Sequence, residues 1–188
     1  MLKDYAFPAR APHGQTAAAN DGGRGYNVRR VVGEDVLRAF PLARLAAGDL
    51  SLPAWLGFAH ALGAETAGVK KPRRPASGRN AEGLLGVEDA RGYLYALCSF
   101  AVAPDLRTGR RLCVDNLVAM DLIDGDIPAQ ALIGALDRLA RDLDCPAYVI
   151  HLPPAAQAAA AGWRFLSGIA GGGGQMQNCV YRTLQTAD

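Results

Sequence analysis

Two different spacings of apolar residues alternate along the chain, and they predict two kinds of element. Short runs rich in valine, leucine and aromatic residues predict strands. These runs are Asn27–Val32, Gly83–Glu88, Tyr93–Ala103, Leu112–Ile123, Ala147–Leu152, Trp163–Ile169 and Gln177–Leu184. Asp89–Gly92 predicts a hairpin turn between the second and third runs, and Pro104–Arg111 predicts a longer connection to the fourth.

Between the strand-like runs, apolar residues recur at helical spacing. The pattern predicts a helix within Gly33–Leu45 that Pro41 interrupts, and a second helix from the N-cap Ser51 to Gly63 with Pro53 near its start. A short alanine-rich helix is predicted over Ala155–Ala161.

The clearest helical stripe lies in the second half of the chain. Four leucines recur there at i, i+4, i+7 and i+11: Leu132, Leu136, Leu139 and Leu143. Asp126 is the predicted N-cap, Pro128 falls in the first turn, and Cys145-Pro146 ends the helix. On the opposite face, the i,i+4 spacing predicts the pairs Asp137–Arg141 and Arg138–Asp142.

The order of these elements predicts an α/β fold of the α+β kind. An antiparallel meander is followed by a strand–helix–strand crossover, which gives a mixed, mostly antiparallel central sheet with helices on both faces and a C-terminal β-hairpin. We expect residues 1–25, rich in glycine and proline, to form a flexible N-terminal arm, and residues 26–188 to form one domain.

Composition narrows the class of protein. The chain has 188 residues, of which 50% are hydrophobic and 20% charged, with a formal net charge of +2. Such a composition excludes disorder throughout, and no apolar run reaches the roughly 20 residues of a membrane span. The near-neutral charge argues against a nucleic-acid-binding protein. The residues between 69 and 80 are basic without interleaved aromatic residues, which favours a solvated loop over an RNA site.

The cysteines and histidines indicate the compartment and weigh against a metal centre. Cys98, Cys113, Cys145 and Cys179 form no C-x-x-C pair, so we expect four reduced thiols in a cytoplasmic protein. The Ala/Arg/Gly bias suggests a bacterial source. Three isolated histidines favour no metal site, and Asp121, Asp124 and Asp126 lack the following Glu of a calcium loop.

Three segments resemble the GNAT superfamily of acyl-CoA-dependent N-acyltransferases. The first, Leu112–Leu143, is similar to the family's apolar strand, R/Q-x-x-G-x-G/A loop and following helix. The second, Ala161-Gly-Trp-Arg-Phe165, resembles the small-Gly-aromatic-x-aromatic entry into the last hairpin. The third, Cys179–Leu184, resembles the closing strand.

The resemblance implies an enzyme that moves an acyl group, acetyl in the first instance, from acetyl-CoA or another acyl-CoA to an amine. It implies that the strand end and the following loop bind the cofactor through Val118, Ala119, Met120, Asp124, Gly125, Asp126, Ile127 and Ala129. Backbone N–H groups at a helix N-terminus would hold the diphosphate. Asp115, on the strand, and His151, at the end of the strand after the crossover helix, are the candidate catalytic bases. Tyr93 and Tyr95 are candidates to line the acceptor pocket.

Several positions depart from the family pattern and support a second hypothesis. Asp124 stands where the family has a basic or amide residue, Ile127 replaces a glycine, Pro128 lacks an N–H, and Ala158 stands where a tyrosine acid is common. These residues favour a GNAT-fold module that has lost transfer chemistry and acts in binding or regulation. The sequence leaves open the acceptor amine, the acyl chain and whether the protein forms a homodimer.

Overall fold

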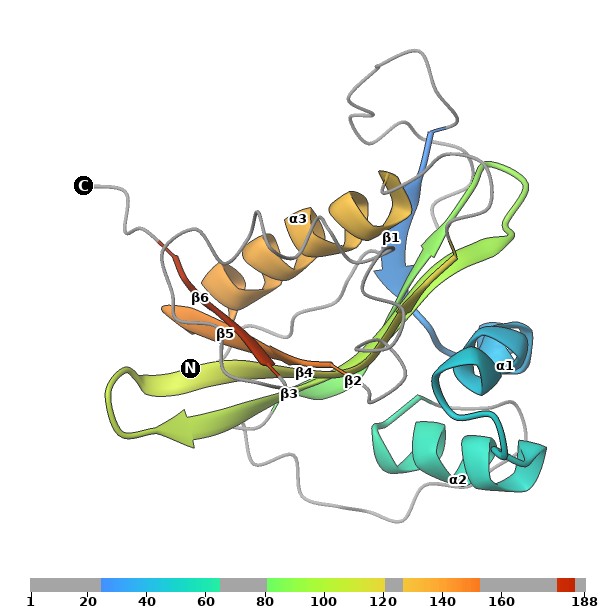
Figure 1. Cartoon of the computed structure of the whole chain (residues 1–188), viewed down its shortest axis with the longest axis horizontal. Helices are drawn as coiled ribbons and strands as arrows, with labels where there is room; N and C mark the ends of the chain where they lie inside the picture. The colour runs from blue at the N-terminus through green and yellow to red at the C-terminus, as the bar shows by residue number, and fades with distance from the viewer. Residues whose placement is uncertain (1–24, 65–80, 121–126, 153–178, 185–188) are drawn as a thin grey trace.

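The computed structural model describes residues 25–64, 81–120, 127–152 and 179–184, which build one six-stranded sheet (Figure 1). Its strands are β1 (Asn27–Arg30), β2 (Glu82–Glu88), β3 (Leu94–Asp105), β4 (Gly109–Ala119), β5 (Ala147–His151) and β6 (Cys179–Thr183). They lie side by side in chain order. The β4–β5 pair is parallel and the other four pairs are antiparallel. The predicted mixed, mostly antiparallel sheet is therefore confirmed.

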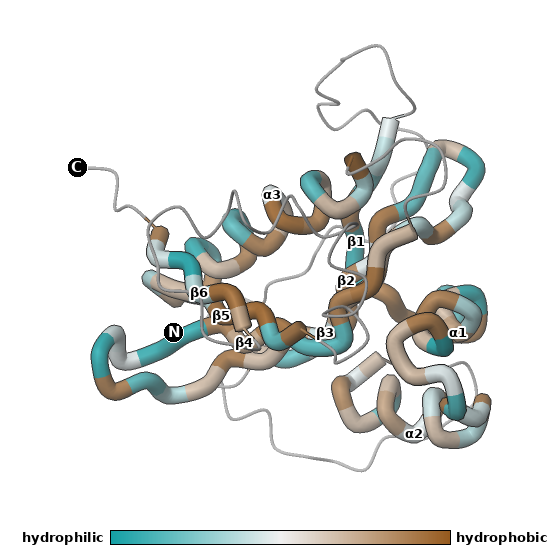
Figure 2. The backbone as a smooth tube through the Cα atoms, in the orientation of Figure 1, coloured by the Kyte–Doolittle hydropathy of each residue, from teal (hydrophilic) through white to brown (hydrophobic). Residues whose placement is uncertain are grey.

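Helices cover both faces of the sheet, as the element order predicts. The helices α1 (Asp35–Ala46) and α2 (Leu52–Ala61) share one apolar cluster with Leu84, Leu97 and Val118 of the sheet. On the other face, α3 (Ile127–Asp142) contributes Leu132, Leu136 and Leu139 to a larger cluster. Figure 2 shows the hydrophobic and hydrophilic segments alternating along α3, as a helix with one buried side requires.

The prediction that Pro41 interrupts the first helix is wrong. The helix α1 runs continuously through Pro41 to Ala46. Pro41 is exposed, while Val36, Ala39 and Leu42 bury their side chains against the sheet. Packing of that apolar side outweighs the hydrogen bond that a proline removes.

The second helix begins as predicted. The Ser51 hydroxyl accepts a hydrogen bond from the Ala54 N–H at 3.3 Å, and Pro53 lies in the first turn, where its missing N–H has no intrahelical partner to lose.

The connection between β3 and β4 is shorter than the sequence predicts. Both strands extend to a tight turn in which the Asp105 carboxylate accepts hydrogen bonds from the Arg107 and Thr108 N–H groups, at 2.9 and 3.0 Å. The paired residues include Pro104 opposite Arg110. Proline is tolerated here because β2 pairs with β3 only as far as Ala101, which leaves Pro104 with a single neighbouring strand.

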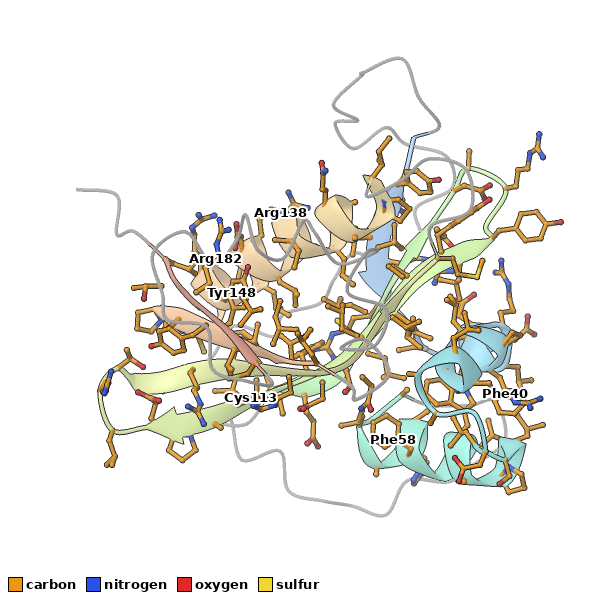
Figure 3. All side chains as sticks on the ribbon, in the orientation of Figure 1. Phe40, Phe58, Cys113, Arg138, Tyr148 and Arg182 are labelled. Carbon is orange, nitrogen blue, oxygen red and sulfur yellow. The ribbon has the colours of Figure 1, made fainter. Side chains whose placement is uncertain are left out.

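The predicted pair Asp137–Arg141 is replaced by contacts with the sheet. The Asp137 carboxylate accepts hydrogen bonds from the Tyr148 hydroxyl of β5 and from the Arg182 guanidinium of β6, both at 2.9 Å. Figure 3 shows Tyr148 and Arg182 between the sheet and α3. Helical spacing predicts that Asp137 faces solvent. It cannot predict the contacts with Tyr148 and Arg182, because these depend on how the strands pack against α3.

Other expectations fall outside the described residues. They concern residues 1–24, the basic segment 69–80, Asp121, Asp124, Gly125, Asp126, the helix Ala155–Ala161 with Ala158, and the hairpin strand Trp163–Ile169. Of the predicted C-terminal hairpin, the structure describes β6.

Candidate functional site

A β-bulge in β4 brings two consecutive polar side chains to the same face of the sheet. Leu97 pairs with Val118 and Ser99 with Asp115, so that two residues of β4, Asn116 and Leu117, lie opposite Cys98 of β3. Asn116 adopts the left-handed conformation, with φ of 53°. As a result, Asp115 and Asn116 both face the side of α1 and α2.

The bulge is anchored by a short chain of hydrogen bonds. The Asn116 amide nitrogen donates to the Ser99 hydroxyl at 3.0 Å, and that hydroxyl donates to the Asp115 carbonyl oxygen at 3.1 Å. Asparagine is among the few residues that adopt positive φ readily. The bulge is therefore a built feature of β4.

The parallel strands β4 and β5 separate where the bulge begins. Their pairing runs from Leu112 opposite Tyr148 to Val114 opposite Ile150, and no described residue of β5 pairs with β4 beyond that point. The edge of β4 after Val114 is thus released from the ladder, which leaves a gap between β4 and β5.

Asp115 and His151, the two predicted catalytic residues, meet across this gap. The Nδ1 atom of His151 lies 2.7 Å from Oδ1 of Asp115. A neutral imidazole that donates from Nδ1 to a carboxylate keeps its Nε2 lone pair free to accept a proton. The side chains are 46% and 47% exposed, so the carboxylate orients the ring more than it stabilises the fold.

A cleft of about 510 Å³ surrounds the Asp115–His151 pair. Its wall includes Ser99 and Asn116 from the sheet, Ala46 from α1, and Phe58 and Leu62 at α2. The cleft is large enough for a reacting amine and the end of an acyl carrier.

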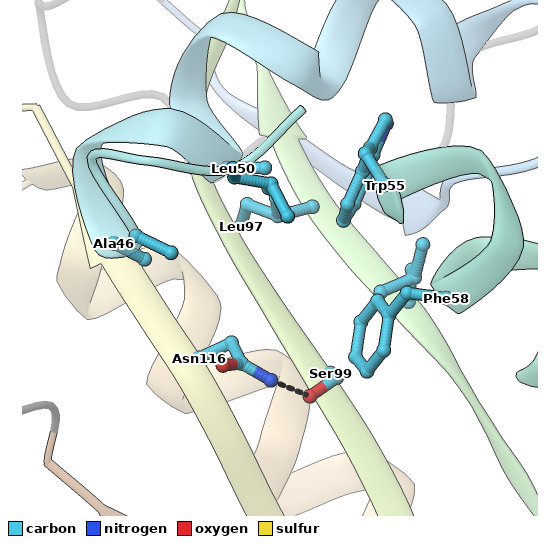
Figure 4. Close-up of a pocket in the computed structure, with 10 residues that line it drawn as sticks. Ala46, Leu50, Trp55, Phe58, Leu97, Ser99 and Asn116 are labelled. Atoms are coloured by element: carbon cyan, nitrogen blue, oxygen red, sulfur yellow. Dashed lines mark hydrogen bonds between the residues drawn. The ribbon is translucent and has the colours of Figure 1, made fainter. Parts of the chain in front are cut away.

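A second, apolar pocket of about 150 Å³ adjoins the cleft between α1, α2 and the sheet (Figure 4). Ala46, Phe58, Ser99 and Asn116 line both spaces, so the two adjoin each other. The pocket is lined in full by Ala43, Ala46, Ala47, Leu50, Trp55, Phe58, Leu84, Leu97, Ser99 and Asn116.

The strand residues expected to bind the cofactor offer backbone rather than side chains. Val118 and Met120 pack in the cluster of α1 and α2, and Ala119 packs toward α3. The Met120 N–H donates to the Tyr95 carbonyl oxygen at 2.7 Å and is already satisfied. Because successive N–H groups of a strand point to opposite edges, the Ala119 N–H is directed to the edge released from β5.

The start of α3 is less suited to bind an anion than the glycine-containing loop of the family pattern. Ile127 is its first residue and is 47% exposed, Pro128 supplies no N–H, and Ala129 is buried. The first-turn N–H groups of Ile127 and Ala129 remain as donors without intrahelical acceptors. The rest of the predicted loop, residues 124–126, lies outside the description.

Comparison with solved structures identifies the architecture. The chain is similar to a ribosomal-protein-alanine N-acetyltransferase from Brucella melitensis, with a TM-score of 0.55 and 20% identity over 81% of this chain and 96% of that one. It is also similar to glucosamine-6-phosphate N-acetyltransferase from Arabidopsis thaliana, with a TM-score of 0.54 and 12% identity over 81% and 97% of the two chains. The chain has the GNAT fold.

The likeness is one of structure. A conserved protein from Enterococcus faecalis also matches, with a TM-score of 0.50 and 9% identity, and there this chain spans 32% of the other's length. No protein-family model matches the sequence, and no curated protein matches it significantly. At these identities the GNAT fold is shared, and substrates have to be argued from the site itself.

Among the described residues, Tyr93 and Tyr95 line neither the cleft nor the apolar pocket. Tyr93 is 65% exposed at the β2–β3 turn. The Tyr95 hydroxyl lies 3.4 Å from the Asp89 carboxylate, and its ring packs edge-on against Tyr26. Their alternation along the strand suggested that both side chains line a pocket. The structure instead places them near the β2–β3 turn and the residue that precedes β1.

Sequence reasoning missed the residues that shape the pocket. The sequence could have indicated Asn116 and Ser99. Asp115-Asn116 breaks the two-residue alternation of β4, and Ser99 is polar within an apolar strand. The sequence gives no indication that Trp55 and Phe58 line a pocket, because an aromatic residue on a helix is equally compatible with core packing.

Two absences hold for residues 25–64, 81–120, 127–152 and 179–184. None of the helices there is long and apolar enough to cross a membrane. Within the same ranges, no group of three or more His, Cys, Asp or Glu side chains is placed to hold a metal ion.

Proposed function

We propose that the chain is an acyl-CoA-dependent N-acyltransferase that moves an acyl group, acetyl in the first instance, to an amine. The observation that carries the proposal is the Asp115–His151 pair in the gap between β4 and β5. The GNAT fold supports it, because the fold's solved members named above are N-acetyltransferases.

In this proposal His151 is the general base. Its Nε2 takes a proton from the amine, whose nitrogen attacks the thioester carbonyl carbon. The C–S bond then breaks, and the thiolate leaves as CoA after taking up the proton from the His151 imidazolium, which regenerates the base. Asp115 holds the ring so that Nε2 points at the amine, and stabilises the imidazolium that forms.

The acyl-CoA would lie along the edge of β4 released from β5. The Ala119 N–H is the strand donor directed there, and the first turn of α3 supplies N–H groups for the diphosphate. With Pro128 in that turn, we expect weaker diphosphate binding than a glycine-rich loop would give.

An acyl-transfer assay with variants of the pair tests this proposal. With acetyl-CoA and a panel of primary amines, His151→Gln should lower kcat by about 100-fold or more, because a positioned base contributes 10²–10⁴-fold. Asp115→Asn should give a smaller loss, since the base itself remains. The KM for acetyl-CoA should stay within about twofold in both variants if the acyl-CoA contacts β4 and α3.

His60→Gln is the matched control, because His60 lies on α2 outside both spaces. It should leave the rate unchanged. If the wild-type protein transfers no acyl group to any amine, or if His151→Gln retains the full rate, the proposed base is wrong. Acetyl-CoA binding without turnover would instead favour the binding or regulatory module.

A further inference from the structure

The apolar pocket beside the Asp115–His151 cleft has the size and lining of a hydrocarbon-binding site. Its volume of about 150 Å³ equals that of an engineered apolar protein cavity that stays dry and binds benzene. Ala46 of α1 lies across the pocket from Trp55 and Phe58 of α2, while Leu97 lies on the sheet side (Figure 4). A ring or a branched chain of about six carbons would fill it.

The Ser99 hydroxyl and the Trp55 indole N–H at the pocket are already engaged. Among the described lining residues none is charged, and the polar side chains of Ser99 and Asn116 bond to each other. The Trp55 indole N–H donates to the Val36 carbonyl oxygen at 2.7 Å, so it offers nothing to a ligand. A charged or polyhydroxylated substituent would lose its water here without gaining partners, which is unfavourable.

The pocket adjoins the cleft in which the proposed chemistry takes place. Ser99 and Asn116 line both the pocket and the cleft, and Asn116 directly follows Asp115. A molecule with its hydrocarbon part between α1 and α2 therefore extends its other end toward His151.

We infer that the acceptor is a primary amine carrying one uncharged hydrocarbon group of about benzene size, aromatic or branched aliphatic. This inference rests on the proposed function and specifies its substrate class. Trp55, Phe58 and Ala46 then determine specificity, and polyamines and amino sugars are poor acceptors.

Binding of the amine can be measured without acyl-CoA. The ¹⁹F resonance of 4-fluorobenzylamine should broaden in the presence of the full chain, and cyclohexylmethylamine should reverse the broadening while spermidine should not. Ala46→Leu fills the pocket from a half-buried position of α1 and should weaken binding by about tenfold or more. Ala61→Leu, at an exposed position of α2 that lines neither space, should change nothing.

A second variant guards against misfolding of the first. Phe58 is 37% exposed, so the Phe58→Ala variant should fold normally. It should still bind 4-fluorobenzylamine more weakly, because the substitution removes one wall of the pocket. Absence of broadening in the wild type, or wild-type affinity in both Ala46→Leu and Phe58→Ala, would overturn the pocket assignment.

Turnover then separates this inference from the proposed function. With acetyl-CoA, kcat/KM for benzylamine should exceed that for ethylamine by about tenfold or more, and Ala46→Leu should erase that ratio. Transfer to ethylamine or spermidine without a preference for benzylamine leaves the proposed function standing and overturns the substrate class. Binding of benzylamine with no transfer to any amine makes it a ligand only, and the acceptor assignment fails together with the proposed function.

Discussion

At the scale of single residues, Asn116 links the fold to the site. Its left-handed backbone forms the bulge, its amide bonds to Ser99, and its side chain lies at the junction of the cleft and the pocket. Asp115 reaches the same face as His151 by the regular alternation of β4 and β5, and the bulge adds Asn116 to that face. One unusual backbone conformation therefore places the Asn116 amide beside the proposed catalytic pair.

We predict that Asn116→Ala destabilises the protein by about 1–2 kcal/mol more than Asn116→Gly does. Both variants lose the bond to Ser99, but only alanine pays the steric cost of positive φ. Urea unfolding of the two variants and the wild type measures this difference. Equal stabilities of the two variants would show that the bulge relaxes when the asparagine is removed.

A second prediction concerns the buried thiol of Cys98. Burial raises its pKa to about 12, while Cys113 and Cys179 are partly exposed. Since the thiolate is the reactive form, Cys98 should react with iodoacetamide at about pH 8 at least a hundredfold more slowly than these two. Mass spectrometry of timed samples gives the rates. All four cysteines should react alike in urea; equal rates in the native protein would contradict the burial of Cys98.

At the scale of elements, Asp137 ties α3 to the last two strands. Its carboxylate accepts hydrogen bonds from the hydroxyl of Tyr148, which is fully buried, and from the guanidinium of Arg182. Burial raises the pKa of the Tyr148 phenol above its ordinary value of 10.0, and the Asp137 carboxylate raises it further. The neutral phenol is therefore the form that the folded protein stabilises.

This shift predicts a loss of stability at alkaline pH. Below about pH 10 the phenol is protonated in both states, and above it the unfolded chain loses a proton that the folded chain retains, so unfolding becomes more favourable as pH rises. The Tyr148 contribution to the slope should approach about 1.4 kcal/mol per pH unit. Tyr148→Phe removes that contribution.

Urea unfolding at about pH 9, 10 and 11 measures the effect. At about pH 9, Tyr148→Phe should be less stable than the wild type by about 1 kcal/mol, the net value of one hydrogen bond. The gap should narrow or reverse by about pH 11. Parallel curves over the whole range would contradict a raised pKa for Tyr148.

The sequence predicted elements better than it predicted their junctions. The leucine stripe of α3 and the Ser51 cap are local patterns, and both are confirmed. Pro41 and Asp137 were wrongly interpreted because packing against the sheet decides their environment. No spacing rule could show that strands bring Asp115 and His151 to 2.7 Å, since 36 residues separate them.

At the scale of the whole molecule, the sheet and its helices create two adjoining spaces with different chemistry. The gap between β4 and β5 holds a polar, half-exposed pair, and the space under α1 and α2 is apolar. In the proposed enzyme the first receives the thioester and the amine nitrogen, and the second receives the hydrocarbon part of the amine. In that proposal the GNAT fold supplies the gap, and the side chains of α1 and α2 supply the selectivity for the amine.

The most direct test of this account is calorimetric titration of the full chain with acetyl-CoA and with CoA. We expect both to bind with one site per chain, and His151→Gln to bind acetyl-CoA within about twofold of the wild type, because the base does not hold the carrier. Absence of heat and of any thermal shift at millimolar acetyl-CoA would contradict the central claim that the gap between β4 and β5 accepts an acyl-CoA.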